Sequence, residues 1–118
     1  MQTFRFLDFT VYKDSKSFYK IVVSLTREFP TIYDDLRKQL IRAALSISLN
    51  IAEGSAKKSD RDFNRYIENS LGSVNESVAT LDIAFENKLI SSTSFKEVVE
   101  LAEGIAKQLG GLSKKLKS

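Results

Sequence analysis

The chain has 118 residues, 42% of them hydrophobic, and its 18 Lys and Arg against 15 Asp and Glu give a formal net charge of +3. That length is enough for one domain with a hydrophobic core, whereas so small a net charge does not identify a nucleic-acid-binding protein. The chain has no Cys and no His, which excludes disulfides, thiolate metal sites and the commonest general base. The start lacks a signal-peptide pattern, and no run of about 18 apolar residues occurs, so we expect a soluble, cytoplasmic protein that crosses no membrane.

The first predicted helix follows an apolar lead-in. Three phenylalanines stand in that lead-in, at Phe4, Phe6 and Phe9. We expect them to cover one end of the fold. The helix itself is predicted over about 10–28, because apolar side chains recur every three or four residues there. Asp8 or Thr10 is its expected N-cap, and Pro30 ends it.

The second helix is predicted over about 32–56, with Thr31 and Asp34 as an approximate capping box and Gly54 as its C-terminal cap. It carries a regular polar series that falls within roughly 80° of arc. The series consists of Gln39, Arg42, Ser46, Asn50 and Glu53. Most of the remaining circumference is apolar, which is wider than the stripe of about 100° that one bundle needs. We therefore expect this helix to be buried on two sides, inside its own bundle and against another subunit.

The polar series has two interpretations. It is either the solvent-facing side of an amphipathic helix or a hydrogen-bonded seam that pairs with Ser73 or Glu76 of the third helix, or with a neighbouring subunit. Buried polar groups need such partners, and short amide and hydroxyl side chains favour the seam. The predicted subunit contact is the outer apolar part of the same helix, namely Ile41, Leu45, Ser48, Leu49 and Ala52. The alternative is that the N-terminal phenylalanines fold over this face within one chain.

Two further helices complete the chain. The third is predicted over about 60–89 and starts at a capping residue, Ser59. Gly72 lies in its middle, where glycine costs about 1 kcal/mol relative to alanine, so we expect another helix to approach closely there. The fourth is predicted over about 93–116, with a capping box that starts at Ser94. Four long helices with short connections predict an all-α, up-and-down four-helix bundle.

Basic residues gather in two parts of the sequence. Residues 56–66 hold four cations and two acids, and residues 107–118 hold four Lys and no acid, whereas residues 67–106 hold two Lys and seven acids. The candidate nucleic-acid contacts are Lys57, Lys58, Arg61, Arg65, Lys114, Lys115 and Lys117. Cations at such places contact phosphates in nucleic-acid-binding proteins. The alternative is a solvated loop and a helix C-terminus, where cations are also favourable.

The two basic groups are expected at opposite ends of the bundle, so one chain would not merge them. A ring of subunits would repeat each group and raise a weak affinity. We expect no aromatic side chain among these cations and therefore no base stacking. Binding should then be tolerant of sequence and strongly dependent on salt.

No catalytic residue, metal site or cofactor is predicted. The acids at 34–35 and 60–62 stand in first turns of helices, where negative charge favours the helix dipole. Di-iron bundles need Glu-x-x-His pairs, and the chain has no His. The sequence also lacks a phosphate-binding loop, so we expect a protein that is not an enzyme.

Four segments together resemble a known family: FRFLDFTVYKDS at 4–15, REFP at 27–30, QLIRAALSISLNIAEG at 39–54 and LGSVNE at 71–76. They are similar to small bacterial four-helix-bundle proteins encoded in intervening sequences of large-subunit (23S) ribosomal RNA genes. Tyr12 departs from the family pattern, which usually has tryptophan there. The resemblance implies a ring-like homo-oligomer, a pentamer. It also implies similarity to accessory proteins of diversity-generating retroelements, which bind a reverse transcriptase and nucleic acid.

Two functions follow from these observations. The first is a non-enzymatic, oligomeric protein associated with RNA or DNA, either ribosomal RNA or retroelement nucleic acid, through its basic residues. The second is a structural ring or scaffold that binds protein partners only, such as a reverse transcriptase. Salt-sensitive binding of nucleic acid by the named Lys and Arg distinguishes the two.

Overall fold

The computed structural model describes residues 3–118. Its four long helices are α1 (Thr10–Thr26), α2 (Asp34–Ser55), α3 (Asp60–Glu86) and α4 (Ser92–Lys117). Two short 3-10 helices, η1 (Arg5–Asp8) and η2 (Thr31–Tyr33), precede α1 and α2. No β-strand occurs within residues 3–118. The predicted all-α fold of four helices is therefore confirmed.

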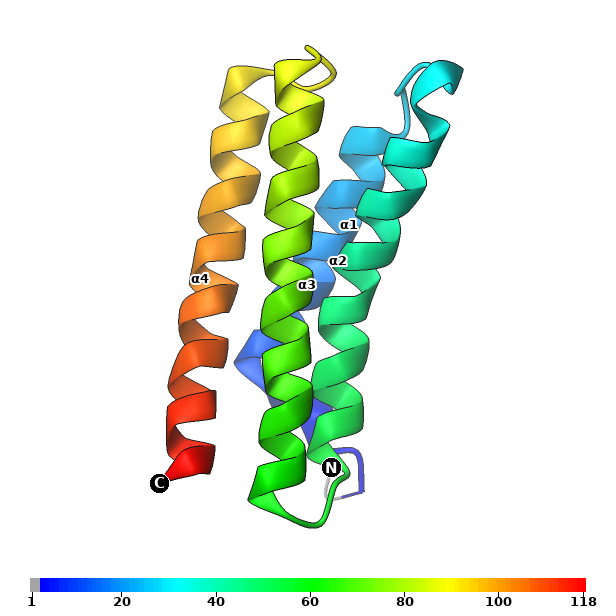
Figure 1. Cartoon of the computed structure of the whole chain (residues 1–118). Helices are drawn as coiled ribbons and strands as arrows, with labels where there is room; N and C mark the ends of the chain where they lie inside the picture. Colours follow the sequence, from blue (N-terminus) through cyan, green and yellow to red (C-terminus); the bar gives the residue numbers. More distant parts are fainter. Residues whose placement is uncertain (1–2) are drawn as a thin grey trace.

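The helices form an up-and-down bundle (Figure 1). Each helix packs against the next one along the chain, and α1 also packs against α4, which closes the bundle. The bundle measures 44 × 22 × 20 Å. The connections α1–α2 and α3–α4 lie at one end, and the α2–α3 connection lies at the other end with η1 and the end of α4 (Figure 1). The long axis therefore separates two ends with different contents.

The core lies between the apolar stripes of the four helices. Its most deeply buried side chains, each with at most 1% of the surface exposed, are Phe18, Val22, Leu40, Ala44, Ile47, Ile51, Ile67, Leu81, Ala84, Val98, Ala102, Ile105 and Leu109. Complete burial of one such large side chain contributes about 1.5–3 kcal/mol. The spacing of three and four residues thus produces the bundle directly, because it places each stripe on one side of its helix.

The last two helices start at serine caps. The Oγ of Ser59 accepts a hydrogen bond from the backbone amide of Asp62 at 3.1 Å, in the position that the sequence indicates. Before α4, the Oγ of Ser91 accepts from the backbone amide of Ser94 at 3.0 Å. The prediction that Ser94 begins the capping box is therefore wrong, since the helix starts at Ser92 and Ser94 lies inside its first turn.

Neither α1 nor α2 has a side-chain cap. The predictions of Asp8 or Thr10 for α1 and of Thr31 for α2 are therefore wrong. In both places a 3-10 turn leads into the helix, and before α2 the amide of Tyr33 donates to the carbonyl of Pro30 at 2.8 Å. Backbone hydrogen bonds of the 3-10 turn thus take the place of a side-chain cap.

Two helical glycines have roles other than those predicted. Gly54 lies inside the last turn of α2, and a Cβ atom there would lie 2.7 Å from the Cβ of Tyr66 and 3.0 Å from the ring of Phe63. A Cβ atom on Gly72 would meet nothing within 4 Å. Helices α2 and α3 therefore approach each other closely at Gly54. Gly54 does not have a positive φ, because Lys88 is the only residue within 3–118 that has one. The predictions of a helix contact at Gly72 and of Gly54 as the C-terminal cap of α2 are both wrong, since Ala56 follows the helix as its cap.

Candidate nucleic-acid interface at one end of the bundle

The two basic groups lie at the same end of the molecule. Helices α2 and α4 both end there (Figure 1), and the Nζ of Lys117 lies 3.4 Å from the Oε2 of Glu68 in the third turn of α3. The prediction that the two basic groups lie at opposite ends of the bundle is wrong. The second and fourth helices of an up-and-down bundle run in the same direction, so both end on the same side. We use the name basic end for the group Lys57, Lys58, Arg61, Arg65, Lys114, Lys115 and Lys117.

Two cations of the basic end form surface ion pairs. Lys57 lies 4.0 Å from Glu53, one turn earlier in the chain, and Lys117 pairs with Glu68. Exposed pairs of this kind contribute about 0–1 kcal/mol. A phosphate can therefore compete with either carboxylate for its cation.

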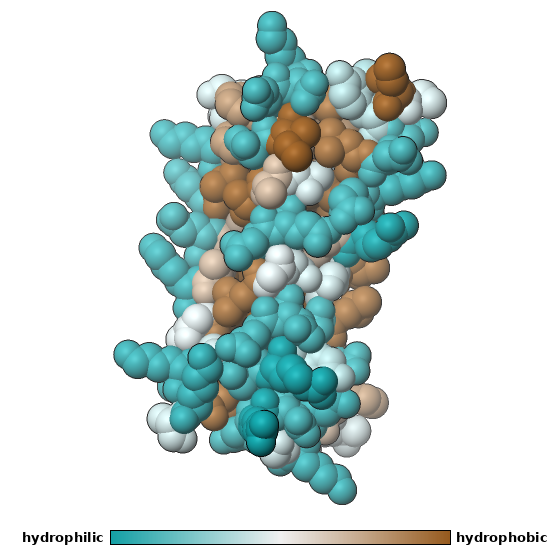
Figure 2. Space-filling view, in the orientation of Figure 1, coloured by the Kyte–Doolittle hydropathy of each residue, from teal (hydrophilic) through white to brown (hydrophobic). Residues whose placement is uncertain are grey.

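Arg65 is exposed and forms no ion pair, but it contacts an aromatic ring. Four other cations of the basic end are exposed and form neither an ion pair nor a contact with an aromatic ring within residues 3–118. They are Lys58, Arg61, Lys114 and Lys115. The C-termini of α2 and α4 carry partial negative charge, with which Lys58, Lys114 and Lys115 interact favourably, whereas Arg61 lies in the first turn of α3. Their charged groups also remain available to an external anion. The face shown in Figure 2 is mostly hydrophilic at this end and shows more apolar surface towards the opposite end.

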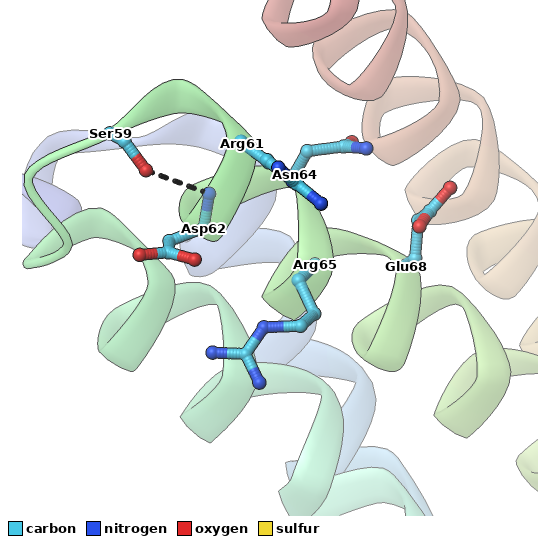
Figure 3. Close-up of a pocket in the computed structure, with 6 residues that line it drawn as sticks. All are labelled: Ser59, Arg61, Asp62, Asn64, Arg65 and Glu68. Carbon is cyan, nitrogen blue, oxygen red and sulfur yellow. Dashed lines mark hydrogen bonds between the residues drawn. The ribbon is translucent and has the colours of Figure 1, made fainter.

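A surface hollow of about 690 Å³ lies at the first turns of α3 (Figure 3). Its lining consists of Ser59, Arg61, Asp62, Asn64, Arg65 and Glu68. The carboxylates of Asp62 and Glu68 lie on either side of the two arginines (Figure 3). The formal charges of the residues that line the hollow therefore cancel. We expect an anion to be attracted to the cations outside the hollow more than to the hollow itself.

Asn64 lines this hollow but points between α3 and α4 (Figure 3), and only 8% of its surface is exposed. Its Oδ1 is buried and has no hydrogen-bond partner in the described part of the chain. A buried acceptor without a partner costs about 1–3 kcal/mol. The start of α3 therefore carries an energetic cost that other buried side chains of residues 3–118 avoid.

An aromatic ring stands among the cations of the basic end. The Nζ of Lys57 and the Cζ of Arg65 each lie 5.0 Å from the ring centroid of Tyr66. The expectation that no aromatic side chain accompanies the basic residues is wrong. Two features of the sequence could have indicated this ring among the cations: Tyr66 follows Arg65 directly, and the glycine at position 54 allows the backbone of α3 at Tyr66 to come close to α2.

The N-terminal segment is attached to the same end by Arg5. Its Nε and Nη2 donate to the backbone carbonyl of Ser55 at 3.2 and 3.0 Å. Its Cζ also lies 5.4 Å from the ring centroid of Phe63 and 5.7 Å from that of Phe9. Ser55 is the last residue of α2, where carbonyls have no partner within the helix. Arg5 thus caps α2 and holds the lead-in over this end of the bundle.

The polar series of α2 meets α3 through hydrogen bonds. Gln39 donates to Glu76, and the Oγ of Ser73 donates to the Oγ of Ser46 at 2.9 Å. The Nδ2 of Asn50 donates to the carbonyl of Ser46 at 2.9 Å and to its Oγ at 3.0 Å. These five residues form what we call the polar seam. It is half-buried at Ser46 and Asn50 and exposed at Gln39 and Glu76.

Two members of the predicted series lie outside the polar seam. Arg42 is exposed and forms no ion pair within residues 3–118. Glu53 pairs with Lys57 on its own side of the molecule rather than with α3. The structure therefore brings five of the seven predicted residues together.

One of the five residues predicted to form the subunit contact is buried within the chain instead. Ser48 is only 4% exposed, and its Oγ shares a hydrogen bond of 2.8 Å with the Oγ of Ser15 in α1. It is therefore part of the α1–α2 contact within one chain. Leu45 and Leu49 are 39% and 56% exposed, so the N-terminal phenylalanines do not cover them. We use the name apolar stripe for Ile41, Leu45, Leu49 and Ala52.

Two other kinds of site are absent from residues 3–118. No three acidic side chains in that part of the chain gather closely enough to hold a metal ion. None of its helices has the length and apolar character needed to span a bilayer.

Comparisons with known proteins identify the family. No curated protein matches the chain. A crystal structure of a protein of unknown function from the S23 ribosomal protein family of Bacteroides thetaiotaomicron is 25% identical, with a TM-score of 0.75, over 89% of this chain and 99% of that chain. The family described as 23S rRNA-intervening sequence protein matches residues 7–111. The chain therefore belongs to the family of 23S rRNA-intervening sequence proteins.

Proposed function

We propose that this protein is a cytoplasmic, non-enzymatic nucleic-acid-binding protein that contacts phosphate groups through its basic end. The observation that carries the proposal is the convergence of two basic groups, far apart in sequence, at one end of a bundle 44 Å long. Four of the cations there have neither an ion pair nor a contact with an aromatic ring within residues 3–118. The target is ribosomal RNA or retroelement nucleic acid. The family description supports the first of these, since it names 23S rRNA.

Binding of this kind is driven by the release of counterions. The logarithm of the affinity for duplex DNA falls against the logarithm of salt concentration by about 0.9 for each phosphate neutralised. The four cations with neither an ion pair nor a ring contact therefore predict a slope of about −3.6 for one copy of the chain. Lys57 and Lys117 add to this slope only if they leave their carboxylates.

The test is fluorescence anisotropy with structured RNA and with duplex DNA across a salt series. One variant replaces Lys58, Arg61, Lys114 and Lys115 by Ala. The control removes the same charge elsewhere, by replacing Lys20, Lys38, Lys88 and Lys96 by Ala. We expect the first variant to lose at least tenfold in affinity and most of the salt slope, and the control to lose little. Equal losses in the two variants, or no binding by the native protein at low salt, would overturn the proposal.

A second function, a homo-oligomeric ring or scaffold, is favoured by a separate observation. Leu45 and Leu49 expose a large part of their apolar surface on one side of α2. We propose that the apolar stripe joins copies of the chain into a ring, of five copies according to the family resemblance. Such a ring could also present a surface to a protein partner such as a reverse transcriptase.

Light scattering after size exclusion measures the mass in solution. A pentamer has about five times the mass of the 13.3 kDa chain. We expect Leu45→Ser with Leu49→Ser to lower the mass, and Ile21→Ser, at a side chain 40% exposed on α1, to leave it unchanged. Asn50→Leu should change the number of subunits more than the helix content. A native protein that elutes as a monomer would exclude the ring.

A further inference from the structure

We infer that the basic end selects unpaired nucleic-acid strands, with the ring of Tyr66 as the surface on which one exposed base stacks. This inference rests on the proposed function and names the structural class of its target.

The backbone beneath the Tyr66 ring is held firmly. Gly54 of α2 comes so close to α3 that a Cβ atom there would lie 2.7 Å from the Cβ of Tyr66. Phe63, one turn earlier, is buried and packs in the core. The ring itself is half-buried at the margin of the α2–α3 contact. The start of the side chain therefore has little room to move, which keeps the ring at one place on the surface.

Two cations lie over this ring, and they come from different elements. Lys57 belongs to the loop between α2 and α3, and Arg65 belongs to α3. Each charged group is 5.0 Å from the ring centroid. A single nucleotide joins a phosphate to a base, so both of its parts can be met within this small area.

The present contacts of these cations are weak enough to be exchanged. Exposed cation–π contacts and surface ion pairs are among the weaker interactions in proteins. Hydrogen bonds from Lys or Arg to a phosphate are stronger because both groups are charged. A bound phosphate therefore draws Lys57 and Arg65 away from the ring and leaves its face open to a base.

Stacking on the ring distinguishes single strands from duplexes. Stacking of one base on an aromatic side chain is worth about 5- to 150-fold in affinity. A base within a duplex is already stacked and paired, and its extrusion costs energy. The cations thus act on every nucleic acid, whereas Tyr66 adds affinity only for unpaired strands.

The test uses anisotropy with a labelled 12-nucleotide RNA, the DNA of the same sequence, and the duplex of each. Tyr66→Phe retains the ring and serves as the matched control for Tyr66→Leu, and circular dichroism checks that both variants fold. We expect Tyr66→Leu to lose about 5- to 150-fold for the single strands and less than about twofold for the duplexes. Tyr66→Phe should retain native affinity. A loss on RNA alone would show that the 2′-hydroxyl also contributes to the site.

Intrinsic fluorescence gives a second readout, because the chain has four Tyr and no Trp. A base that stacks on Tyr66 should quench part of the tyrosine emission in the native protein, and this part should be missing in Tyr66→Phe. Equal losses on single strands and duplexes, or no loss in Tyr66→Leu, would overturn the inference. The proposed function would still stand in that case if the variant at Lys58, Arg61, Lys114 and Lys115 loses affinity. It fails separately if that variant binds like the native protein.

Discussion

The two flanks of α2 differ in how far a single chain completes them. The flank towards α3 has the polar seam and a further buried hydrogen bond from the Oγ of Ser70 to the carbonyl of Ile47, at 2.9 Å. The opposite flank is apolar, yet Leu45 and Leu49 are more exposed than the half-buried Ser46. The comparison teaches that polar side chains on a helix need not mark its solvent side. Short hydroxyl groups can pair across a close helix contact, whereas apolar groups can remain outside.

The largest expected effect on stability is at the core face of α2, and it should be much larger than the effect at the apolar stripe. Ile51 is fully buried and Leu49 is 56% exposed. We predict that Ile51→Ala lowers the free energy of unfolding by about 2–5 kcal/mol, because it leaves a cavity. Leu49→Ala should change it by no more than about 0.5 kcal/mol at low protein concentration. Urea denaturation measures both values, and equal losses would show that Leu49 is buried in solution.

The second prediction tests the close approach on the α3 side. Gly54→Ala should lower the free energy of unfolding by about 1–3 kcal/mol, because the new methyl group overlaps Tyr66. Gly72→Ala is the matched control in open space, and it should raise the free energy by about 0.5–1 kcal/mol. Thermal unfolding of the two variants should therefore shift in opposite directions. A shift of both in the same direction would mean that α2 and α3 are packed differently.

The third prediction concerns the polar seam itself. Ser46→Ala, Ser73→Ala and the double variant form a cycle around one half-buried hydrogen bond of 2.9 Å. We expect a coupling of about 0.5–1.5 kcal/mol between the two sites. Because Asn50 also contacts Ser46, the single variant at Ser46 should cost more than that at Ser73. A coupling near zero in denaturation measurements would contradict a shared hydrogen bond.

The smallest effect is expected at the exposed end of the polar seam. Gln39 donates to Glu76, but both side chains are open to water. Water can replace this bond, so Gln39→Ala should cost at most about 0.5 kcal/mol. The same denaturation assay checks it. A loss larger than that of Ser73→Ala would place the strongest part of the seam at the surface.

The positions of the helices could be read from the sequence because the apolar spacing is regular. The stripe from Phe63 through Ile67 to Leu81 is buried as the period requires. The caps were harder to predict, since four consecutive hydroxyl residues, 91–94, stand at the start of α4 and each could cap it. In the structure, Ser91 is the residue of these four that caps α4. Local patterns therefore predict helices more reliably than they predict their first residue.

The candidate site could be predicted as a set of residues but not as an arrangement. The roles of Gly54 and Gly72 depend on which helix lies opposite each one. Ser48 looks like part of an outer face until Ser15 of α1 is placed beside it. The ring of Tyr66 acquires Lys57 only when the α2–α3 loop folds back. In each case the deciding partner lies on another element, which periodicity within one helix does not reveal.

The cap that Arg5 places on Ser55 has a consequence for the order of folding. It joins residues 50 positions apart, whereas the contacts inside each helix are local. Closing so long a loop costs more entropy than extending a helix, so we expect η1 to dock after the α1–α2 hairpin has formed. Pulse-labelled hydrogen exchange should then find the amide of Phe9 protected later than that of Ile47, and simultaneous protection would contradict this order. The loop that holds Lys57 and Lys58 follows Ser55 directly, so these two residues of the proposed interface should be among the last to reach their final positions.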